Sequence, residues 1–147
     1  MALVWTTDHV ANTNLTNHVT VSHDAGVTWS DPIDTGVEAQ ASNLMHVRDD
    51  LLLTIHSHRE RKVELVVRIV NFANDRWRTI EEFTIWNRAP RSQIASYAQM
   101  AMNLRFGQPS LLQLDNGELL ATHWAMDDGQ GKILTHRYDV NSAAPRR

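Results

Sequence analysis

One short polar segment, residues 56–62, carries many of the side chains that could do chemistry. It reads His-Ser-His-Arg-Glu-Arg-Lys and follows an apolar run. Because side chains two residues apart on a strand point to the same side, we expect His56 and His58 to share one face. Imidazole binds zinc or copper, and guanidinium groups hold carboxylates by paired hydrogen bonds. The segment is therefore consistent with a solvated strand end, a metal site, or a pocket for an anionic ligand using Arg59, Arg61 or Lys62.

A second hairpin repeats the first one 67 residues later along the chain. Four identical pairs align: Leu44 with Leu111, Leu52 with Leu119, Leu53 with Leu120, and His56 with His123. The turns coincide as well, at 49–50 and at 116–117, and the second turn contains Asn-Gly, a strong hairpin signal. The sequence therefore predicts a repeated structural unit in which His123 takes the place of His56.

The elements that must position these residues are mostly β-strands. Alternating apolar and polar residues predict strands, with turn residues between them. The expected strands are 3–7, 18–22, 44–47, 51–56, 63–70, 79–86, 111–114, 118–124 and 132–138. One helical pattern covers 92–105, where apolar residues recur at helical spacing after Pro90. Arg68 lies inside an apolar strand, and we interpret it as a paired structural arginine in preference to a ligand-binding one.

Composition excludes several classes of function. The chain has 147 residues, 14 Lys and Arg against 17 Asp and Glu, and a net charge of −3, so no basic excess indicates nucleic-acid binding. It has no cysteine, which excludes disulfides, thiolate zinc sites and a thiol nucleophile. No apolar run is long enough for a transmembrane helix, and the first residues lack the pattern of a signal peptide. The length is that of a typical single domain.

The octapeptide Ser-His-Asp-Ala-Gly-Val-Thr-Trp at 22–29 fits the pattern S-x-D-x-G-x-T-W. This segment resembles the Asp-box of sialidases and other proteins with bacterial neuraminidase repeats. The role that the resemblance implies is structural: Ser22, Asp24 and Thr28 brace a turn, Gly26 adopts a strained backbone conformation, and Trp29 packs under the neighbouring strand. A degenerate copy, Asn-Asp-Arg-Trp, follows at 74–77. The spacing of about 48 residues suits one four-stranded propeller blade.

The resemblance implies an all-β fold, a partial β-propeller of about 2.5–3 four-stranded antiparallel blades. The expected blades are 1–35, 36–86 and 107–140, with a short helical insertion near 92–105 and a tail at 141–147. Propellers generally need about four to eight blades, and the sialidase family has six. We therefore expect either a piece of a longer propeller or a half-ring completed by a second copy.

In sialidases the active site lies on the face opposite the Asp-boxes. It uses three arginines for the sugar carboxylate, an Asp acid, and a Tyr nucleophile paired with a Glu. By alignment, the Tyr position holds Gln108, the Glu falls near Ala41, and one arginine falls near His56. An amide cannot act as a phenolic nucleophile, and alanine cannot act as a base. These departures argue against catalysis by this chain alone, and no catalytic residue is assigned. The candidate substrate-binding residues are His56, His58, Arg59, Arg61, Gln108 and His123.

The leading hypothesis is a member of the sialidase-like glycoside hydrolase superfamily that acts on or recognises terminal acidic sugars. One alternative is a non-catalytic glycan-binding propeller piece, and another is a structural fragment completed by self-association. We expect a glycan or small sugar as ligand, no cofactor or metal, and neither nucleic acid nor membrane as partner. The compartment follows from the N-terminus: cytoplasmic by default, or secreted if the true N-terminus is missing.

Overall fold

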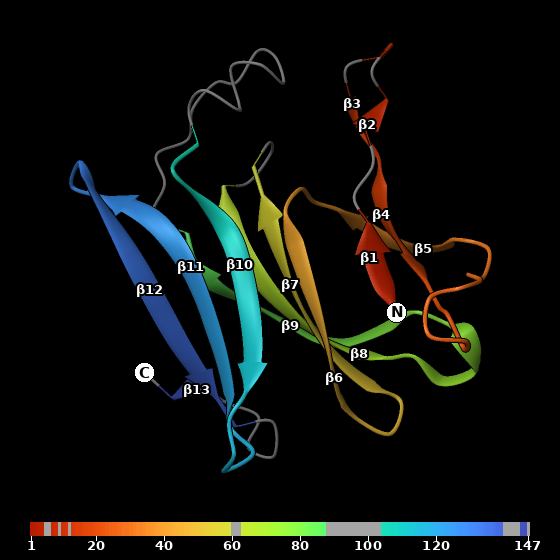
Figure 1. Ribbon diagram of the computed structural model, residues 1–147. Helices are drawn as coiled ribbons and strands as arrows, with labels where there is room; N and C mark the ends of the chain where they lie inside the picture. Colours follow the sequence, from red (N-terminus) through yellow and green to blue (C-terminus); the bar gives the residue numbers. More distant parts are fainter. Residues whose placement is uncertain are drawn as a thin grey trace.

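In the computed structural model, the described residues are 1–4, 7–8, 10–11, 13–59, 63–87, 104–139 and 145–146. They form antiparallel β-sheets and contain no α-helix, which confirms the all-β class (Figure 1). The expected helix over 92–105 lies outside the described residues, apart from its last two positions. No helix in the described part of the chain has the length and apolar character needed to cross a membrane.

The first sheet has three strands in the order β1 (Ala2–Val4), β4 (Thr16–Thr20) and β5 (Ile33–Glu38). Two very short strands, β2 (Thr7–Asp8) and β3 (Thr13–Asn14), pair with each other between β1 and β4. The alternating burial of β4 and β5 places Asn17, Val19, Thr35 and Val37 on the covered face. One face of this sheet is therefore packed and the other is open.

The middle and third sheets repeat one layout. The middle sheet runs β6 (Ser42–Arg48), β7 (Leu51–His58), β8 (Glu64–Asn71) and β9 (Arg78–Trp86), with a 3-10 turn η1 (Ala73–Asp75) before β9. The third sheet runs β10 (Phe106–Gln113), β11 (Leu119–Asp127), β12 (Gln130–Tyr138) and β13 (Pro145–Arg146). In both sheets each strand pairs with the next one along the chain.

Strand pairing confirms the internal repeat. Leu44 lies opposite Thr54 in the middle sheet, and Leu111 lies opposite Ala121 in the third sheet. The neighbouring pairs of the two hairpins agree at the same displacement of 67 residues. Equal register means that equivalent residues point to equivalent faces. His56 and His123 therefore occupy matching places on β7 and β11.

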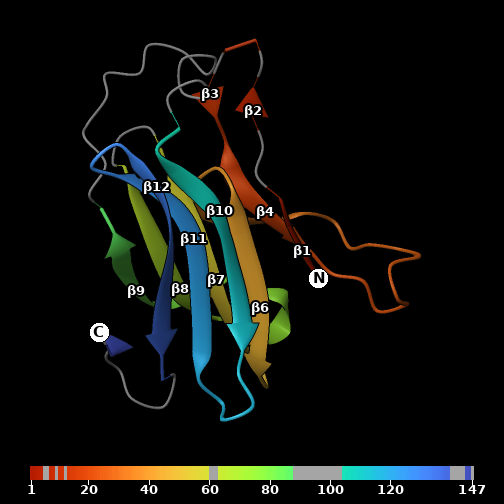
Figure 2. The ribbon, with the colours of Figure 1, turned by 60° about the vertical axis from the view of Figure 1, so that its left-hand side comes forward.

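The three sheets stand side by side, with the middle sheet between the other two (Figures 1 and 2). The first strands approach one another, since β6 contacts both β1 and β10. One apolar cluster joins the middle sheet to the third sheet through Leu53, Val67, Trp86, Phe106 and their neighbours. A smaller cluster joins the middle sheet to the first through residues that include Val19 and Leu52. The middle sheet thus packs against the third sheet at one interface and against the first sheet at the other.

The Asp-box forms the connection between β4 and β5, and it projects away from the sheets (Figure 2). Asp24 accepts hydrogen bonds from the Thr28 amide at 2.8 Å, the Thr28 hydroxyl at 2.6 Å and the Ser22 hydroxyl at 2.8 Å. These donors lower the pKa of Asp24 to about 2. Gly26 has a φ of 91°, a conformation that favours glycine. The box therefore braces a turn, as the sequence predicted.

Trp29 differs from the expectation. It is 49% exposed, and its indole N–H donates to the Gly26 carbonyl at 3.1 Å. The side chain folds back on its own turn rather than lying under a neighbouring strand. The degenerate copy behaves differently, because Trp77 packs edge-on against Phe72 beside the smaller cluster. Of the tryptophans in the box and in its degenerate copy, only Trp77 contributes to a core.

Candidate binding pocket between the first and middle sheets

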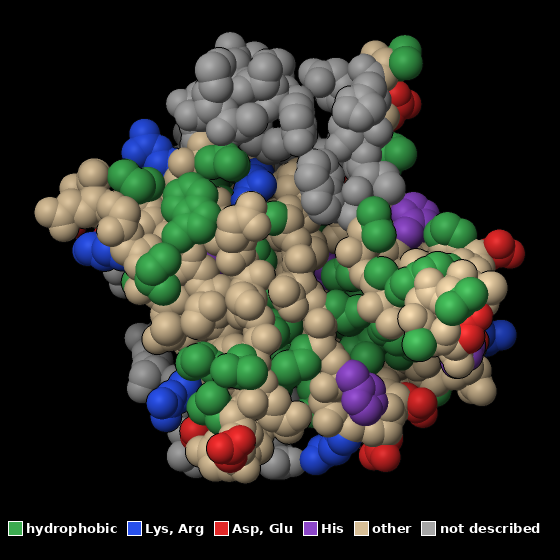
Figure 3. Space-filling view, in the orientation of Figure 1, with side chains coloured by type: hydrophobic (Ala, Val, Ile, Leu, Met, Phe, Trp, Pro, Cys, Tyr) green, Lys and Arg blue, Asp and Glu red, His purple; other side chains and the backbone are tan. Residues whose placement is uncertain are grey.

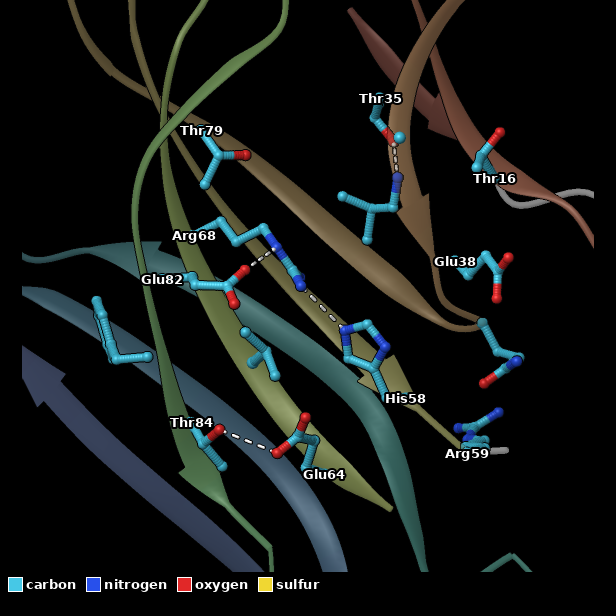
Figure 4. A pocket seen from close by; sticks show the side chains of 15 residues that line it. Thr16, Thr35, Glu38, His58, Arg59, Glu64, Arg68, Thr79, Glu82 and Thr84 are labelled. Atoms are coloured by element: carbon cyan, nitrogen blue, oxygen red, sulfur yellow. Dashed lines mark hydrogen bonds and ion pairs between the residues drawn. The ribbon is translucent and has the colours of Figure 1, made fainter. Parts of the chain in front are cut away.

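A pocket of about 570 Å³ lies between the first sheet and the polar face of the middle sheet (Figure 4). One wall is β5 and the residues that follow it, and the opposite wall is β8 and β9. Labelled side chains of both walls point into the same space in Figure 4. The lining residues are Thr16, Thr35, Gly36, Val37, Glu38, Gln40, His58, Arg59, Glu64, Val66, Arg68, Thr79, Glu82, Phe83 and Thr84.

Arg68 is the central polar side chain of this pocket. It lies on β8 opposite Glu82 of β9, and its Nε donates to Glu82 Oε2 at 3.0 Å. Its Nη2 donates to His58 Nε2 at 3.2 Å. Arg68 is 7% exposed, and its third nitrogen, Nη1, is buried and has no hydrogen-bond partner among the described residues. A buried donor without a partner is costly, and a ligand that supplies an acceptor would satisfy it.

His58 is held in its neutral form. Burial, followed by the nearby Arg68 charge, lowers the pKa of His58 below its usual value. Because Nε2 accepts a hydrogen bond from Arg68, the ring proton is assigned to Nδ1. His58 therefore orients the guanidinium without adding charge to the pocket near neutral pH.

The remaining polar groups of the pocket are the Arg59 guanidinium and acidic, hydroxyl and amide side chains. Glu64 accepts a hydrogen bond from the Thr84 hydroxyl at 3.1 Å. The side chain of Gln40 is almost fully buried, and its Oε1 has no hydrogen-bond partner. The pocket-lining residues thus include one buried donor, Arg68 Nη1, and one buried acceptor, Gln40 Oε1, that have no partner among the described residues.

A buried polar network lies in the same interface as the pocket. His56 is fully buried; its Nδ1 donates to Asn17 Oδ1 at 3.1 Å, and its Nε2 accepts from Thr54 Oγ1 at 2.9 Å. Asn17 donates to the Ala39 carbonyl at 2.8 Å, and the Ser42 hydroxyl donates to the Gln40 carbonyl at 2.7 Å. Burial holds the pKa of His56 well below its usual value. His56 thus ties the first sheet to the middle sheet and does not line the pocket.

The other predicted site residues lie in several places. His58 shares a face with His56, as the strand period predicted, and it lines the pocket together with Arg59. Arg59 also crosses to the third sheet, where Nη2 donates to the Phe106 carbonyl at 3.3 Å and the guanidinium lies over the Phe106 ring. Gln108 is exposed on β10. Arg61 lies outside the described residues.

His123 lies in the other interface. It is buried against Trp86 of the middle sheet, and its ring lies beside that of His136. His56 and His123 therefore face different neighbours, so His56, His58 and His123 do not converge on a metal site. Within the described residues, no group of three or more His, Cys, Asp and Glu side chains is placed to hold a metal ion.

Sequence reasoning favoured a structural over a ligand-binding role for Arg68 and did not name Gln40 as a site residue, whereas both line the pocket. The predicted pairing of Arg68 is confirmed by its ion pair with Glu82. The sequence signal for this pairing was the position of Arg68 inside an apolar strand, because a charged side chain is rarely buried without a partner. No local signal marked Gln40, since the pocket forms only when β5 lies against β8.

The pocket is equipped for recognition through hydrogen bonds. Tyr138, the one described tyrosine, is buried against Phe83 outside the pocket lining, and burial raises its pKa. It therefore offers no phenolic nucleophile to a ligand in the pocket.

Comparison with known proteins gave no match: no family model matches the chain, and neither a curated protein nor a solved structure matches it significantly.

Proposed function

We propose that this protein is a glycan-binding member of the sialidase-like superfamily, and that its pocket beside Arg68 recognises a saccharide without hydrolysing it. The carrying observation is the buried, unpartnered Nη1 of Arg68 in a pocket of about 570 Å³. That nitrogen needs an acceptor oxygen. A sugar hydroxyl or carboxylate supplies one, and the volume suits a small ligand.

The other lining groups support a polyhydroxylated ligand. Threonine hydroxyls, the Gln40 amide and the glutamates accept or donate the hydrogen bonds that sugar hydroxyls make. Three glutamates and two arginines are among the described lining residues, and His58 is neutral. This balance favours a neutral saccharide over the acidic sugar expected from the resemblance. A ligand carboxylate at Arg68 would be repelled by the carboxylate of Glu82, which already pairs with the same guanidinium.

Recognition rather than hydrolysis is proposed because the chain lacks matching catalytic groups. Gln108 occupies the position aligned with the nucleophile, and Ala41 occupies the position aligned with its base. Neither side chain can carry out its aligned step. The Asp-box resemblance supports the superfamily assignment and says nothing of turnover.

The test is glycan-array screening followed by titration calorimetry with the best neutral and sialylated saccharides. We expect Arg68→Met to weaken binding at least about tenfold, because a hydrogen bond to a charged group contributes about 1.5–3 kcal/mol. Arg137→Met, on the exposed part of β12, is the matched control and should bind as the wild type does.

Equal affinity of Arg68→Met and wild type would overturn this pocket as the site, and so would failure of every saccharide to bind. Release of fluorophore from a fluorogenic sialoside would overturn the non-catalytic assignment. Preference for sialylated over neutral glycans would reverse the proposed charge selectivity.

Self-association is a second candidate function, supported by the outer face of the third sheet. Leu53 and Leu65 are 1% and 0% exposed where the third sheet covers them. Leu120 matches Leu53 in the repeat. Ile133 matches Leu65, because Ser57 pairs with Leu65 as its equivalent Trp124 pairs with Ile133. Ile133 is 73% exposed, and hydrophobic side chains gather over this sheet (Figure 3).

This open face continues the stacking that the chain already uses between its own sheets. A second copy offers a sheet of the same kind, so we propose that it covers the face. Sedimentation velocity over a range of concentrations should show dimers that Ile133→Lys abolishes and Val27→Lys, on the exposed loop, does not. A wild type that remains a monomer at the highest concentration would contradict this candidate.

A further inference from the structure

The histidine pair of the third sheet has no part in the proposed sugar pocket. His123 lies on β11 and His136 on β12, where Ala121 faces His136 and His123 faces Leu134. The two histidines are therefore diagonal neighbours on the face that packs against the middle sheet. Their Nε2 atoms are 3.2 Å apart.

The two imidazole rings meet edge to edge. Their planes differ by only 7°, and their centroids are 5.3 Å apart, much farther than the two nitrogens. If one ring lay over the other, with nitrogen above nitrogen, the two separations would be similar. The rings must therefore lie nearly end to end, with each Nε2 directed at the other.

Hydrogen bonding fixes the proton positions in the pair. His123 Nδ1 donates to the Trp124 carbonyl at 3.2 Å, so His123 Nε2 carries a lone pair. His136 Nε2 then donates its proton to that lone pair. A single hydrogen thus lies between the two Nε2 atoms: it is bonded to His136 Nε2, and the lone pair of His123 Nε2 accepts it.

We propose that His123 and His136 bind one monovalent d10 cation, Cu⁺ or its redox-stable analogue Ag⁺, between their two Nε2 atoms. The ion takes the place of the shared hydrogen, and His136 carries its proton on Nδ1 instead. Two N–metal bonds form, one N–H bond moves within the ring, and no electron is transferred. The nitrogens separate slightly to admit the ion, and His123 keeps its bond to the Trp124 carbonyl.

The collinear arrangement selects this class of ion. Zn²⁺ takes four ligands in a tetrahedron, and Cu²⁺ prefers a tetragonal set. Cu⁺ and Ag⁺ readily accept two nitrogen donors in a line. In the described part of the chain, the pair belongs to no larger cluster of ligating side chains. Trp86 covers the His123 ring, whereas half-buried His136 leaves an approach from solvent.

The test is calorimetric titration of the intact protein with silver nitrate in chloride-free buffer. We expect one Ag⁺ per chain in the wild type and in His23→Ala, which removes an exposed histidine. His136→Gln should bind at least about tenfold more weakly, because loss even of an outer partner of a metal ligand costs about 10–100-fold.

A second measurement is X-ray absorption of the wild type loaded anaerobically with Cu⁺. It should show two nitrogen neighbours in a linear geometry. Affinity of His136→Gln equal to that of wild type would overturn the proposal. Sulfur neighbours, or three or more ligands around copper, would overturn it as well. None of these outcomes depends on whether a saccharide binds.

Discussion

The two faces of the middle sheet carry different kinds of side chain. The face toward the third sheet carries Leu53, Ile55, Leu65 and Val67, all buried in one apolar cluster with aromatic rings. The face toward the first sheet carries Thr54, His56, His58 and Arg68 over the same strands. Period-two alternation in β7 and β8 therefore makes one face apolar, whereas the other combines these hydrogen-bonding side chains with Leu52 and Val70 of the smaller apolar cluster.

This difference has an energetic meaning. Apolar burial stabilises an interface without direction, whereas a buried polar interface holds its shape only where each group finds a partner. Among the described residues, Arg68 Nη1 and Gln40 Oε1 lack a partner on the side of the first sheet, and Ser57 Oγ lacks one on the side of the third sheet. The third-sheet interface thus supplies stability, and the first-sheet interface supplies specificity at some cost in stability.

The largest expected effect is Phe106→Ala, which attacks the apolar interface. Phe106 is almost fully buried; its ring centroid lies 4.7 Å from that of Trp86 and under the Arg59 guanidinium. Loss of a buried Phe costs about 3–5 kcal/mol of unfolding free energy. Urea denaturation measures this, with exposed Leu112→Ala as the control. A loss under about 1 kcal/mol would show that this interface does not carry the stability.

A smaller effect is expected on acidification, which attacks the polar interface through His56. Burial lowers the pKa of His56 well below its usual 6.5. Just below pH 6.5, His56 is therefore protonated in the unfolded chain but remains neutral in the folded protein. Stability is therefore present above pH 6.5 and is lost as pH falls below it, at up to about 1.4 kcal/mol per pH unit for this group.

Denaturation at several pH values tests this. His58, His123 and His136, whose pKa values burial also lowers, add to the slope. His56→Asn, which cannot titrate, should flatten the slope, whereas His23→Ala should leave it unchanged. An unaltered slope in His56→Asn would mean that the polar interface is not the acid-sensitive one.

Much of the fold could be predicted from the sequence, because its signals are local. The hairpin turns at 49–50 and 115–117, the period-two runs and the repeat that aligns His56 with His123 are all confirmed by strand register. Asp24 braces its turn through residues at most four positions away, so its pattern is readable in one dimension.

The pocket could be predicted only in fragments. His58 and Arg59 were singled out from residue type, and the pairing of Arg68 from its apolar surroundings. The propeller resemblance implies that the loop 37–42, which holds Gln40, lies on the same face as 56–62, but the strand β5 of the opposing wall was not predicted. His56 and His123 look alike in sequence, but their neighbouring sheets differ: one meets Asn17 and the other Trp86. Which sheet covers a face is a tertiary fact that local pattern does not encode.

The smallest effect is expected outside both interfaces, at the Asp-box. Asp24→Asn weakens the charge-assisted bonds that hold the loop, but neither apolar cluster includes this turn. We expect faster hydrogen exchange at the Thr28 amide and no measurable change in the global unfolding midpoint, with Asp31→Asn in the same loop as the control. The hydrogen bonds of the loop lower the pKa of Asp24 to about 2. Its contribution to the local stability of the loop is therefore present above the usual pKa of 3.8 and disappears as pH falls through 2. A drop in the global midpoint would show that the box couples to the first-sheet interface, and stability would then not reside in the two interfaces alone.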